Sequence, residues 1–226
     1  MSPLEQIDVI IPTLNAATSL AATLAALPPG VAVIVSDGGS TDDTTAIAHA
    51  AGARVVTGPR GRGCQLAAGA REATRPWSLF LHADTTVSPE GWAAISRHID
   101  RPDSRDLAAS LRLEIDDPAW QARVIEKAVA WRVRHLGLPY GDQGLLIHRD
   151  LYGAVGGYPD LPLMEDVEMI RRLGKGRHVG LSGAARTSAA RWRRRGWIRQ
   201  TALNLICISL YRLGVSADRI AKLYGR

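Results

Sequence analysis

The sequence of 226 residues predicts an α/β fold with a mostly parallel β-sheet flanked by helices. Four short apolar runs alternate with four alanine-rich segments of helical pattern, the runs at residues 7–12, 31–36, 54–57 and 77–82 and the helices at about 16–27, 42–52, 62–74 and 89–99. This alternation is typical of βαβ units, whose strands run parallel. Asp37 and Asp84 come at the ends of two of these runs. Open α/β folds bind their ligands at that edge of the sheet, so we expect chemistry there.

The second half of the sequence predicts a further lobe beside this site, on the side where a second substrate, the acceptor, would bind. Its expected elements are a strand at 107–115, a long helix ending at 136, a helix at 164–173, a loop at 180–188, and helices ending at 213 and 224. The helix at 164–173 carries an acidic pair, Glu165 and Asp166, near its start. We predict one domain, residues 1–190, with a basic and amphipathic C-terminal helical extension, residues 191–226.

The charge of the chain is +6, and it is distributed unevenly. Residues 1–170 hold 14 basic and 21 acidic residues, whereas residues 171–226 hold 14 basic and one acidic residue. This asymmetry suggests contact with an anionic partner, whether a diphosphate, lipid headgroups or nucleic acid. A solvated basic face is the alternative interpretation.

The cysteine content and the apolar segments indicate the cellular compartment of the protein. Cys64 and Cys207 stand far apart and outside any CxxC or Cys/His cluster, so neither a disulfide framework nor a zinc site is predicted. The N-terminus has no basic region typical of a secretory signal. The longest apolar stretch, residues 201–215, is too short to span a bilayer. We expect a cytoplasmic protein, with peripheral contact at the inner membrane face as a further hypothesis.

Two common classes of nucleotide-binding protein are not supported by the sequence. The segment after the first apolar run, Pro12-Thr13-Leu14-Asn15, lacks the glycines that a dinucleotide requires for close approach to the backbone. A glycine pair at Gly61 and Gly63 matches the dinucleotide fingerprint only in part, and no Walker-type loop is present.

The two acidic strand ends suggest separate roles. Asp37 precedes two glycines that would let a flat ring approach the backbone, and its carboxylate would accept hydrogen bonds from a base or ribose. An acidic turn that caps a helix is the alternative. Asp84 would give one oxygen to a hard divalent cation that takes its other ligands from water and substrate phosphates. His82 is interpreted as a second ligand, a ribose contact or a packed histidine.

These segments together resemble the family 2 glycosyltransferases with the GT-A fold, a Rossmann-like architecture. The resemblance covers roughly residues 7–195 and rests on Val9-Ile-Ile-Pro-Thr-Leu-Asn15, Ser36-Asp-Gly-Gly-Ser-Thr-Asp42, Leu81-His-Ala-Asp84 and Glu165-Asp166. It implies that Pro12, Thr13, Asn15 and Asp37 hold the nucleoside of a nucleotide-sugar donor, that Asp84 holds Mg²⁺ or Mn²⁺ on its diphosphate, and that Asp166 is the catalytic base.

The sequence departs from the usual Asp-X-Asp motif of this family, which appears as His82-Ala83-Asp84. Further segments, Gly61-Arg-Gly-Cys-Gln65, Gly141-Asp-Gln143 and Arg191-Trp192, are similar to a small bacterial branch linked to arsenosugar biosynthesis.

The expected reaction is a single displacement that inverts the anomeric centre of the sugar. A metal at Asp84 would neutralise the departing diphosphate, and Asp166 would take the proton of an acceptor hydroxyl. Arg62 and Arg191 are candidate contacts of the donor phosphates. The acceptor-side candidates are Asp142, Gln143, Trp192 and Glu165, of which Glu165 is expected mainly to orient the start of its helix.

The C-terminal segment suggests a membrane contact. Arg193-Arg-Arg195 and Trp197 precede an apolar helix face formed by Ile198, Ala202, Leu205, Ile206, Ser209, Leu210 and Leu213. Such a face would lie on an anionic membrane that supplies a lipid-linked acceptor. Packing of this helix on the domain or on a second subunit is the alternative.

Two rival functions follow from the same features. A sugar-phosphate nucleotidyltransferase shares the nucleotide and the metal, but it would need a glycine-rich basic loop in place of residues 12–15. A nucleic-acid binder would use the basic tail, but the sequence has no RRM, helix-turn-helix or zinc signature, so no nucleic acid is expected.

Overall fold

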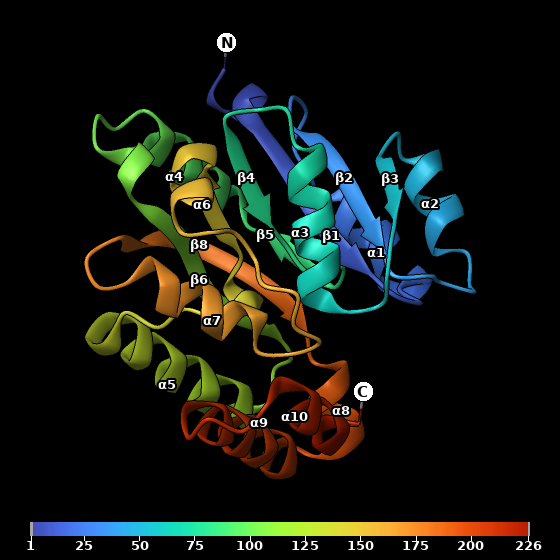
Figure 1. The fold of residues 1–226 in the computed structure, drawn as a ribbon, viewed down its shortest axis with the longest axis vertical. Coiled ribbons are helices and arrows are strands. Elements are labelled where there is room, and N and C mark those ends of the chain that lie inside the picture. Colours follow the sequence, from blue (N-terminus) through green and yellow to red (C-terminus); the bar gives the residue numbers. More distant parts are fainter. Residues whose placement is uncertain (1, 226) are drawn as a thin grey trace.

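The first half of the chain forms the parallel part of the sheet. The computed structural model describes residues 2–225. After a short 3-10 helix, η1 (Pro3–Gln6), its elements are β1 (Ile7–Thr13), α1 (Ala17–Ala25), β2 (Ala32–Asp37), α2 (Thr44–Ala50), β3 (Arg54–Thr57), α3 (Arg62–Glu72) and β4 (Trp77–Phe80). Strands β3, β2, β1 and β4 lie side by side in that order, all parallel. Figure 1 shows this part in blue and green on the right.

The second half completes one mixed sheet with strand order β3-β2-β1-β4-β7-β6-β8-β5. Its elements are β5 (Thr85–Val87), α4 (Pro89–Ile99), η2 (Ser104–Asp106), β6 (Ala108–Asp116), α5 (Trp120–Leu136), η3 (Gly141–Gln143), β7 (Leu145–His148), α6 (Arg149–Ala154), α7 (Glu165–Leu173) and β8 (His178–Ser188). Strand β7 runs antiparallel to both β4 and β6, whereas β6 and β8 are parallel. The predicted mostly parallel sheet flanked by helices is therefore confirmed.

Alternating side chains of the buried strands build an apolar layer on each face of the sheet. Val9 and Ile11 pack toward Leu20 of α1 and Ile95 of α4. Ile10 packs on the opposite face, in the layer formed by α3, α6 and α7. Because both faces are covered, β1 is apolar from Val9 to Pro12, as expected for a central parallel strand.

The prediction of a loop at residues 180–188 is wrong, because these residues belong to strand β8. This strand pairs with β6 over most of its length, from Ala108 opposite His178 to Asp116 opposite Ser188. Its many glycine, alanine and serine residues do not form the apolar pattern by which a strand is predicted from sequence. Gly183 has φ +87°, and a Cβ there would lie 2.3 Å from the backbone nitrogen of Gly91 at the start of α4. The close approach of α4 to β8 thus selects a residue that strands usually avoid.

The C-terminal helices α8 (Ala190–Arg195), α9 (Trp197–Arg212) and α10 (Ala217–Tyr224) lie below the sheet, next to α5 and α7 (Figure 1). Cys207 of α9 and Ile220 of α10 share an apolar cluster with Met164 and Val167 at the start of α7. Tyr211 also donates a hydrogen bond to Glu168 of α7, at 3.1 Å. One side of α9 is therefore packed on the remainder of the protein. Within residues 2–225, no helix has the length and apolarity needed to cross a membrane.

Candidate active site

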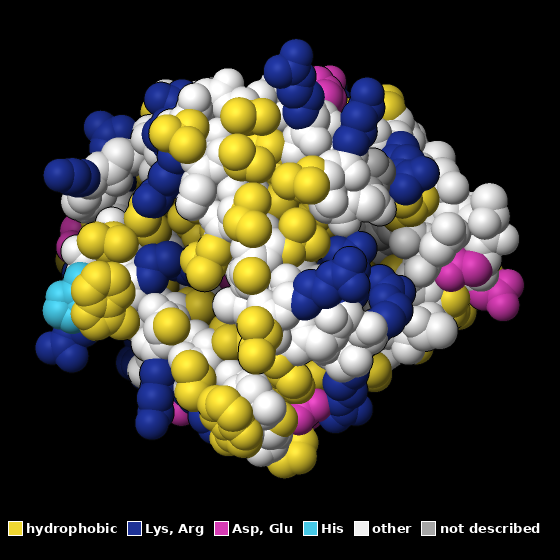
Figure 2. Space-filling model, turned by 90° about the horizontal axis from the view of Figure 1, so that it is seen from below, with side chains coloured by type: hydrophobic (Ala, Val, Ile, Leu, Met, Phe, Trp, Pro, Cys, Tyr) yellow, Lys and Arg dark blue, Asp and Glu magenta, His cyan; other side chains and the backbone are white. Residues whose placement is uncertain are grey.

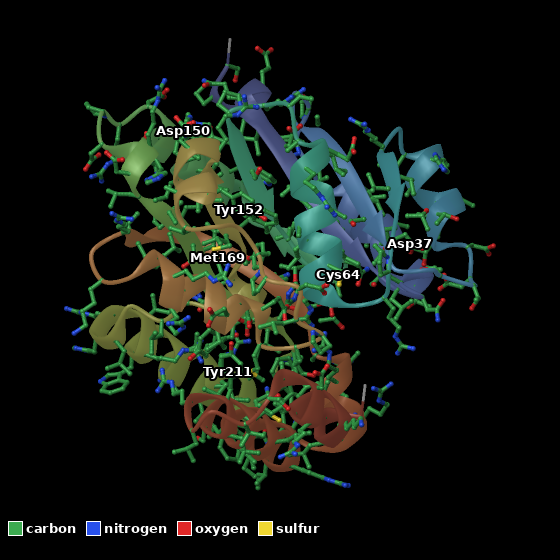
Figure 3. All side chains as sticks on the ribbon, viewed as in Figure 1. Asp37, Cys64, Asp150, Tyr152, Met169 and Tyr211 are labelled. Atoms are coloured by element: carbon green, nitrogen blue, oxygen red, sulfur yellow. The ribbon has the colours of Figure 1, made fainter. Side chains whose placement is uncertain are left out.

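The carboxyl ends of β1 and β2 are held together by a network around Asp37. The Asp37 carboxylate accepts hydrogen bonds from the Thr13 hydroxyl (2.9 Å), the backbone of Gly39 (2.9 Å) and the backbone of Ser40 (2.7 Å). Burial raises the pKa of Asp37, but the hydrogen bonds from Ser40, Thr13 and Gly39 outweigh it, so the pKa is lowered. Asp37 is 1% exposed and lies at the end of β2 (Figure 3). Its carboxylate is a fixed anion that shapes the loop behind the site.

A polar cavity of about 820 Å³ lies in front of these strand ends. We call it the strand-end cavity; its lining includes the predicted residues Pro12, Thr13, Asn15, Arg62, Asp84 and Arg191. Asn15 has φ +50°, and its side-chain oxygen accepts a hydrogen bond from the backbone of Thr41 at 2.8 Å. The loop after β1 is thereby locked to the loop after β2, and the wall of the cavity is preformed.

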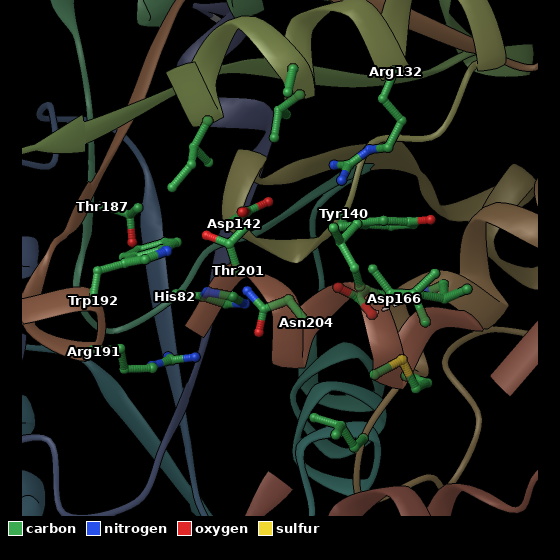
Figure 4. A pocket seen from close by; sticks show the side chains of 18 of the residues that line it. His82, Arg132, Tyr140, Asp142, Asp166, Thr187, Arg191, Trp192, Thr201 and Asn204 are labelled. Carbon is green, nitrogen blue, oxygen red and sulfur yellow. Dashed lines mark hydrogen bonds between the residues drawn. The ribbon is translucent and has the colours of Figure 1, made fainter. Parts of the chain in front are cut away.

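A second cavity, of about 500 Å³, lies between α5, α7 and α9 (Figure 4). We call it the interhelical cavity; of the predicted residues, its lining includes Asp142, Asp166 and Trp192. Arg62, His82, Asp84 and Arg191 line both cavities. The two spaces therefore meet at the segment that joins β4 to β5.

Asp166 lies in the first turn of α7 and faces the junction of the two cavities. Its Oδ2 accepts a hydrogen bond from the backbone of Gly141 at 2.8 Å. A Cβ added at Gly141 would lie 2.9 Å from His82 Nε2 and 3.3 Å from Asp166 Oδ2, so both side chains flank this glycine. A carboxylate is also favoured at a helix N-terminus by the macrodipole. Asp166 is therefore an oriented anion with a face toward the interhelical cavity.

Arg62 and Glu165 form a buried ion pair beside Asp166. Arg62 Nη1 lies 3.2 Å from Glu165 Oε1, and the Glu165 side chain is 1% exposed. Burial lowers the pKa of the Arg62 guanidinium, but the carboxylates of Glu165, Asp166 and Asp84 outweigh it, so the pKa is raised. Arg62 thus keeps a positive charge at the point where the two cavities meet.

Asp84 is the carboxylate best placed to hold a metal ion with a diphosphate. It lines both cavities, its side chain is 25% exposed, and Arg191 Nη2 lies 3.9 Å from its Oδ2. No group of three or more His, Cys, Asp or Glu side chains within residues 2–225 is arranged to hold a metal. A single carboxylate fits a cation that takes its remaining ligands from phosphates and water, which is common for Mg²⁺.

Asp142 and Gln143 are neighbours in the sequence, yet the structure places them differently. Asp142 lines the interhelical cavity; burial raises its pKa, Arg132 opposes the rise, and Asp166 adds to it. Gln143 is buried, and its amide donates a hydrogen bond to the backbone oxygen of Leu111 at 2.8 Å. Gln143, Asp37 and Glu165 are thus outside the lining of both cavities.

Several polar residues of the interhelical cavity were not predicted from the sequence. They are Arg132, Tyr140, Thr201 and Asn204. The Arg132 guanidinium stacks on the Tyr140 ring, 4.0 Å from its centroid. These residues belong to α5, the segment before η3, and α9, and no motif links them. A polar residue inside an otherwise apolar helix pattern is the one signal the sequence carries for Thr201 and Asn204.

Comparison with known sequences identifies the family. The sequence model described as Glycosyl transferase family 2 matches residues 8–155. The chain belongs to this family. A curated relative, the uncharacterized glycosyltransferase Rv0539 of Mycobacterium tuberculosis (strain ATCC 25618 / H37Rv), is 35% identical over 133 residues, which cover 58% of this chain and 60% of Rv0539. The chain therefore matches less than two thirds of that relative's length.

Solved structures of glycosyltransferases share the fold. TarS 1–349 of S. aureus, solved in complex with UDP-GlcNAc, superposes with a TM-score of 0.62 at 16% identity, over 80% of this chain and 58% of TarS. The mannosyltransferase PcManGT of Pyrobaculum calidifontis, solved with GDP-Man and Mn²⁺, gives 0.63 at 16% identity, over 96% of this chain and 67% of that protein. Identities this low establish the fold alone, and the GT-A fold predicted from the sequence is confirmed.

Proposed function

We propose that this family 2 glycosyltransferase moves a sugar from a nucleoside-diphosphate sugar to an acceptor hydroxyl with inversion of the anomeric centre. The observation that carries the proposal is the junction of the two cavities. Asp84 lines both of them, whereas Asp166 lines the interhelical cavity. A donor in the strand-end cavity would place its sugar at this junction, next to an acceptor in the interhelical cavity.

The donor side is assigned to the loops after β1 and β2. Pro12, Thr13 and Asn15 line the strand-end cavity and would contact the nucleoside, and Asp37 would support them from behind. Arg62 and Arg191 lie where the diphosphate would end, and their guanidinium groups suit phosphate oxygens. The likeness to structures solved with UDP-GlcNAc and GDP-Man supports a nucleotide-sugar donor.

Asp84 would hold a divalent cation, Mg²⁺ or Mn²⁺, on the donor diphosphate. When bound, such a cation stabilises negative charge on the leaving group. Mn²⁺ in the related PcManGT complex supports this assignment. Arg191, 3.9 Å from Asp84, adds a positive charge that helps to compensate the carboxylate and the phosphates.

Asp166 would act as the base. In one displacement, the acceptor oxygen forms its bond to the anomeric carbon, the bond from that carbon to the diphosphate oxygen breaks, and Asp166 takes the hydroxyl proton. We infer inversion because, among the described residues, neither Glu165 nor Asp142 is suited to attack the sugar as a second carboxylate. Glu165 is engaged by Arg62, and burial raises the pKa of Asp142, which weakens it as a nucleophile.

The acceptor side is assigned to the interhelical cavity, with Asp142 and Trp192 as contacts and helices α8, α9 and α10 as its roof. Glu165 and Gln143 would position this side from behind. The rival sugar-phosphate nucleotidyltransferase is disfavoured because residues 12–15 form a wall locked by Asn15 rather than a glycine-rich basic loop.

A thermal-shift screen of UDP, GDP, dTDP and CDP, each with and without Mn²⁺ or Mg²⁺, tests this function. We expect one nucleoside diphosphate to raise the Tm in the presence of metal and its sugar conjugate to be hydrolysed slowly to an inverted sugar, detected by proton NMR. Release of pyrophosphate from a nucleoside triphosphate and a sugar phosphate would instead support the nucleotidyltransferase.

A further inference from the structure

The interhelical cavity has a polar inner end whose hydrogen-bonding groups are incomplete. Four buried atoms there, Asp142 Oδ1, Arg132 Nη2, Trp192 Nε1 and Thr201 Oγ1, have no hydrogen-bond partner among the described residues. A buried polar group without a hydrogen-bond partner is destabilising unless a ligand or water pairs with it. Four such groups around one space point to a ligand that supplies both donors and acceptors, as a head group with several hydroxyls does.

The outer end of the same cavity is apolar and open to the surface. Val124, Trp131 and Leu136 of α5 and Leu205 of α9 line it, and they are exposed by 54%, 58%, 53% and 60%. A purely polar acceptor would leave this end in contact with water. The change from polar to apolar along one cavity instead matches a molecule with a hydroxylated head and a hydrocarbon chain.

Further hydrophobic side chains are exposed on the helices that line this opening. Ile198 of α9 is 86% exposed, Leu213, directly after α9, is 82% exposed, and Trp120 of α5 is 70% exposed. We call these three residues the outer face. Figure 2 views this end of the molecule and shows a band of hydrophobic side chains with Lys and Arg side chains on both sides. A contiguous band of exposed apolar side chains is typical of interaction surfaces.

Charge indicates the partner of the outer face. By helical spacing, Arg199 and Arg212 lie on either side of the exposed apolar strip of α9, and both are exposed. A second copy docked through the same face would bring rims of like charge together, which is unfavourable. An anionic bilayer accepts both the apolar strip and its arginine flanks.

We propose that the acceptor is a membrane lipid with a hydroxylated head, whose head lies beside Asp166, whose chain leaves between α5 and α9, and whose bilayer receives the outer face. This inference rests on the proposed transferase function and adds the substrate class. It also joins the two sequence alternatives for the C-terminal helix, because one side of α9 packs on α7 while the opposite side contacts lipid.

A series of alkyl β-glucosides tests the cavity, because the head stays constant while the chain grows from methyl to octyl. Binding is measured by tryptophan fluorescence at concentrations below micelle formation. We expect the affinity to rise about two- to fourfold per added methylene. Val124→Asp with Leu205→Asp, at the mouth of the cavity, should remove this dependence, whereas Ile198→Asp with Leu213→Asp should keep it. Equal affinity for methyl and octyl glucoside would overturn the proposal.

Sedimentation with vesicles tests the outer face, using phosphatidylcholine alone or mixed with phosphatidylglycerol. We expect binding to the anionic vesicles and its loss in Ile198→Asp with Leu213→Asp. The matched control is Ala21→Asp with Ala25→Asp, two exposed positions on α1 that introduce the same charge and should bind as the wild type does. Absence of vesicle binding overturns the proposal, as does a dimer in light scattering that the outer-face variant dissociates.

Nucleotide thermal shifts, recorded on the same proteins, separate the two proposals. If a nucleoside diphosphate with metal stabilises the protein while chain length has no effect on glucoside binding, the lipid acceptor is wrong and the transferase function stands. If no nucleotide stabilises it, the transferase function itself fails. Retained stabilisation in the Asp variants shows that they are folded.

Discussion

The two cavities that meet at Asp84 differ in how their polar groups are satisfied. Behind the strand-end cavity, the protein satisfies the Asp37 carboxylate, which accepts hydrogen bonds from Thr13, Gly39 and Ser40. In the interhelical cavity, four buried polar atoms find no hydrogen-bond partner among residues 2–225. The first region is a preformed wall, whereas the second is the one that we propose a ligand completes. The comparison suggests that one scaffold can keep its donor chemistry while its acceptor changes with the helices.

The largest effect that would test the separation of a donor side from an acceptor side is expected at Asp166. Asp166→Asn should lower kcat by about 10²- to 10⁴-fold, because the amide cannot accept the acceptor proton. The nucleotide thermal shift should remain, since Asp166 does not line the strand-end cavity. Steady-state kinetics with the matched control Asp150→Asn, an exposed carboxylate, should show no change. Loss of nucleotide binding in Asp166→Asn would break the division between donor and acceptor sides.

The next largest effect is expected at Arg62, where the two regions join. Arg62→Gln removes a charged partner of the buried Glu165 carboxylate and should lower the free energy of unfolding by about 3–5 kcal/mol. Arg54→Gln breaks the exposed pair with Glu72 and should cost less than about 1 kcal/mol. Urea denaturation measures both variants. Equal losses of unfolding free energy in the two variants would mean that burial does not make the Arg62 ion pair more important for stability.

At Asp84, a substitution is expected to weaken binding of the donor. Asp84→Asn should weaken metal-dependent binding of the nucleoside diphosphate at least about tenfold, a loss of about 1.4 kcal/mol, because an amide is a poorer ligand for a hard cation. Asp218→Asn, which alters another carboxylate lining the strand-end cavity, should bind as the wild type does. Isothermal titration with Mn²⁺ present compares them. Unchanged binding in Asp84→Asn would remove the metal assignment.

The smallest effect concerns the attachment of α9 to α7. Hydrogen bonds from Arg171, Arg172 and Tyr211 lower the pKa of Glu168 from 4.5 to about 2. A lowered folded-state pKa stabilises the protein above pH 4.5, and this contribution is lost as the pH falls toward about 2. The urea midpoint of Glu168→Gln should therefore approach that of the wild type over this range.

Tyr211→Phe is the matched control for Glu168. It should cost about 1 kcal/mol through one lost hydrogen bond and should keep the pH dependence, because both arginines remain. A difference between wild type and Glu168→Gln that is constant with pH would contradict the assignment of the shift to Glu168.

The sequence predicted the strand-end region better than the helical region, for a physical reason. Pro12 and Thr13 end strand β1 and Asn15 follows it closely, so local pattern and the geometry of parallel sheets suffice to place them. Arg132 and Thr201 lie on helices distant in sequence, and only tertiary packing brings them to one cavity. Strand β8 was missed because its glycines are selected by the close approach of α4, a contact that no local pattern contains.

The ion pair between Arg62 and Glu165 joins the first residue of α3 to the first residue of α7. One helix begins beside the strand-end cavity and the other carries Asp166, and this side-chain contact acts together with the backbone hydrogen bond from Gly63 to Leu161 in fixing how far apart they lie. Exchange of these two residues for a longer or shorter pair is expected to shift the proposed base relative to the proposed donor site while leaving every strand in register. This contact is accordingly a position at which evolution can adjust the reach of the enzyme without rebuilding its fold.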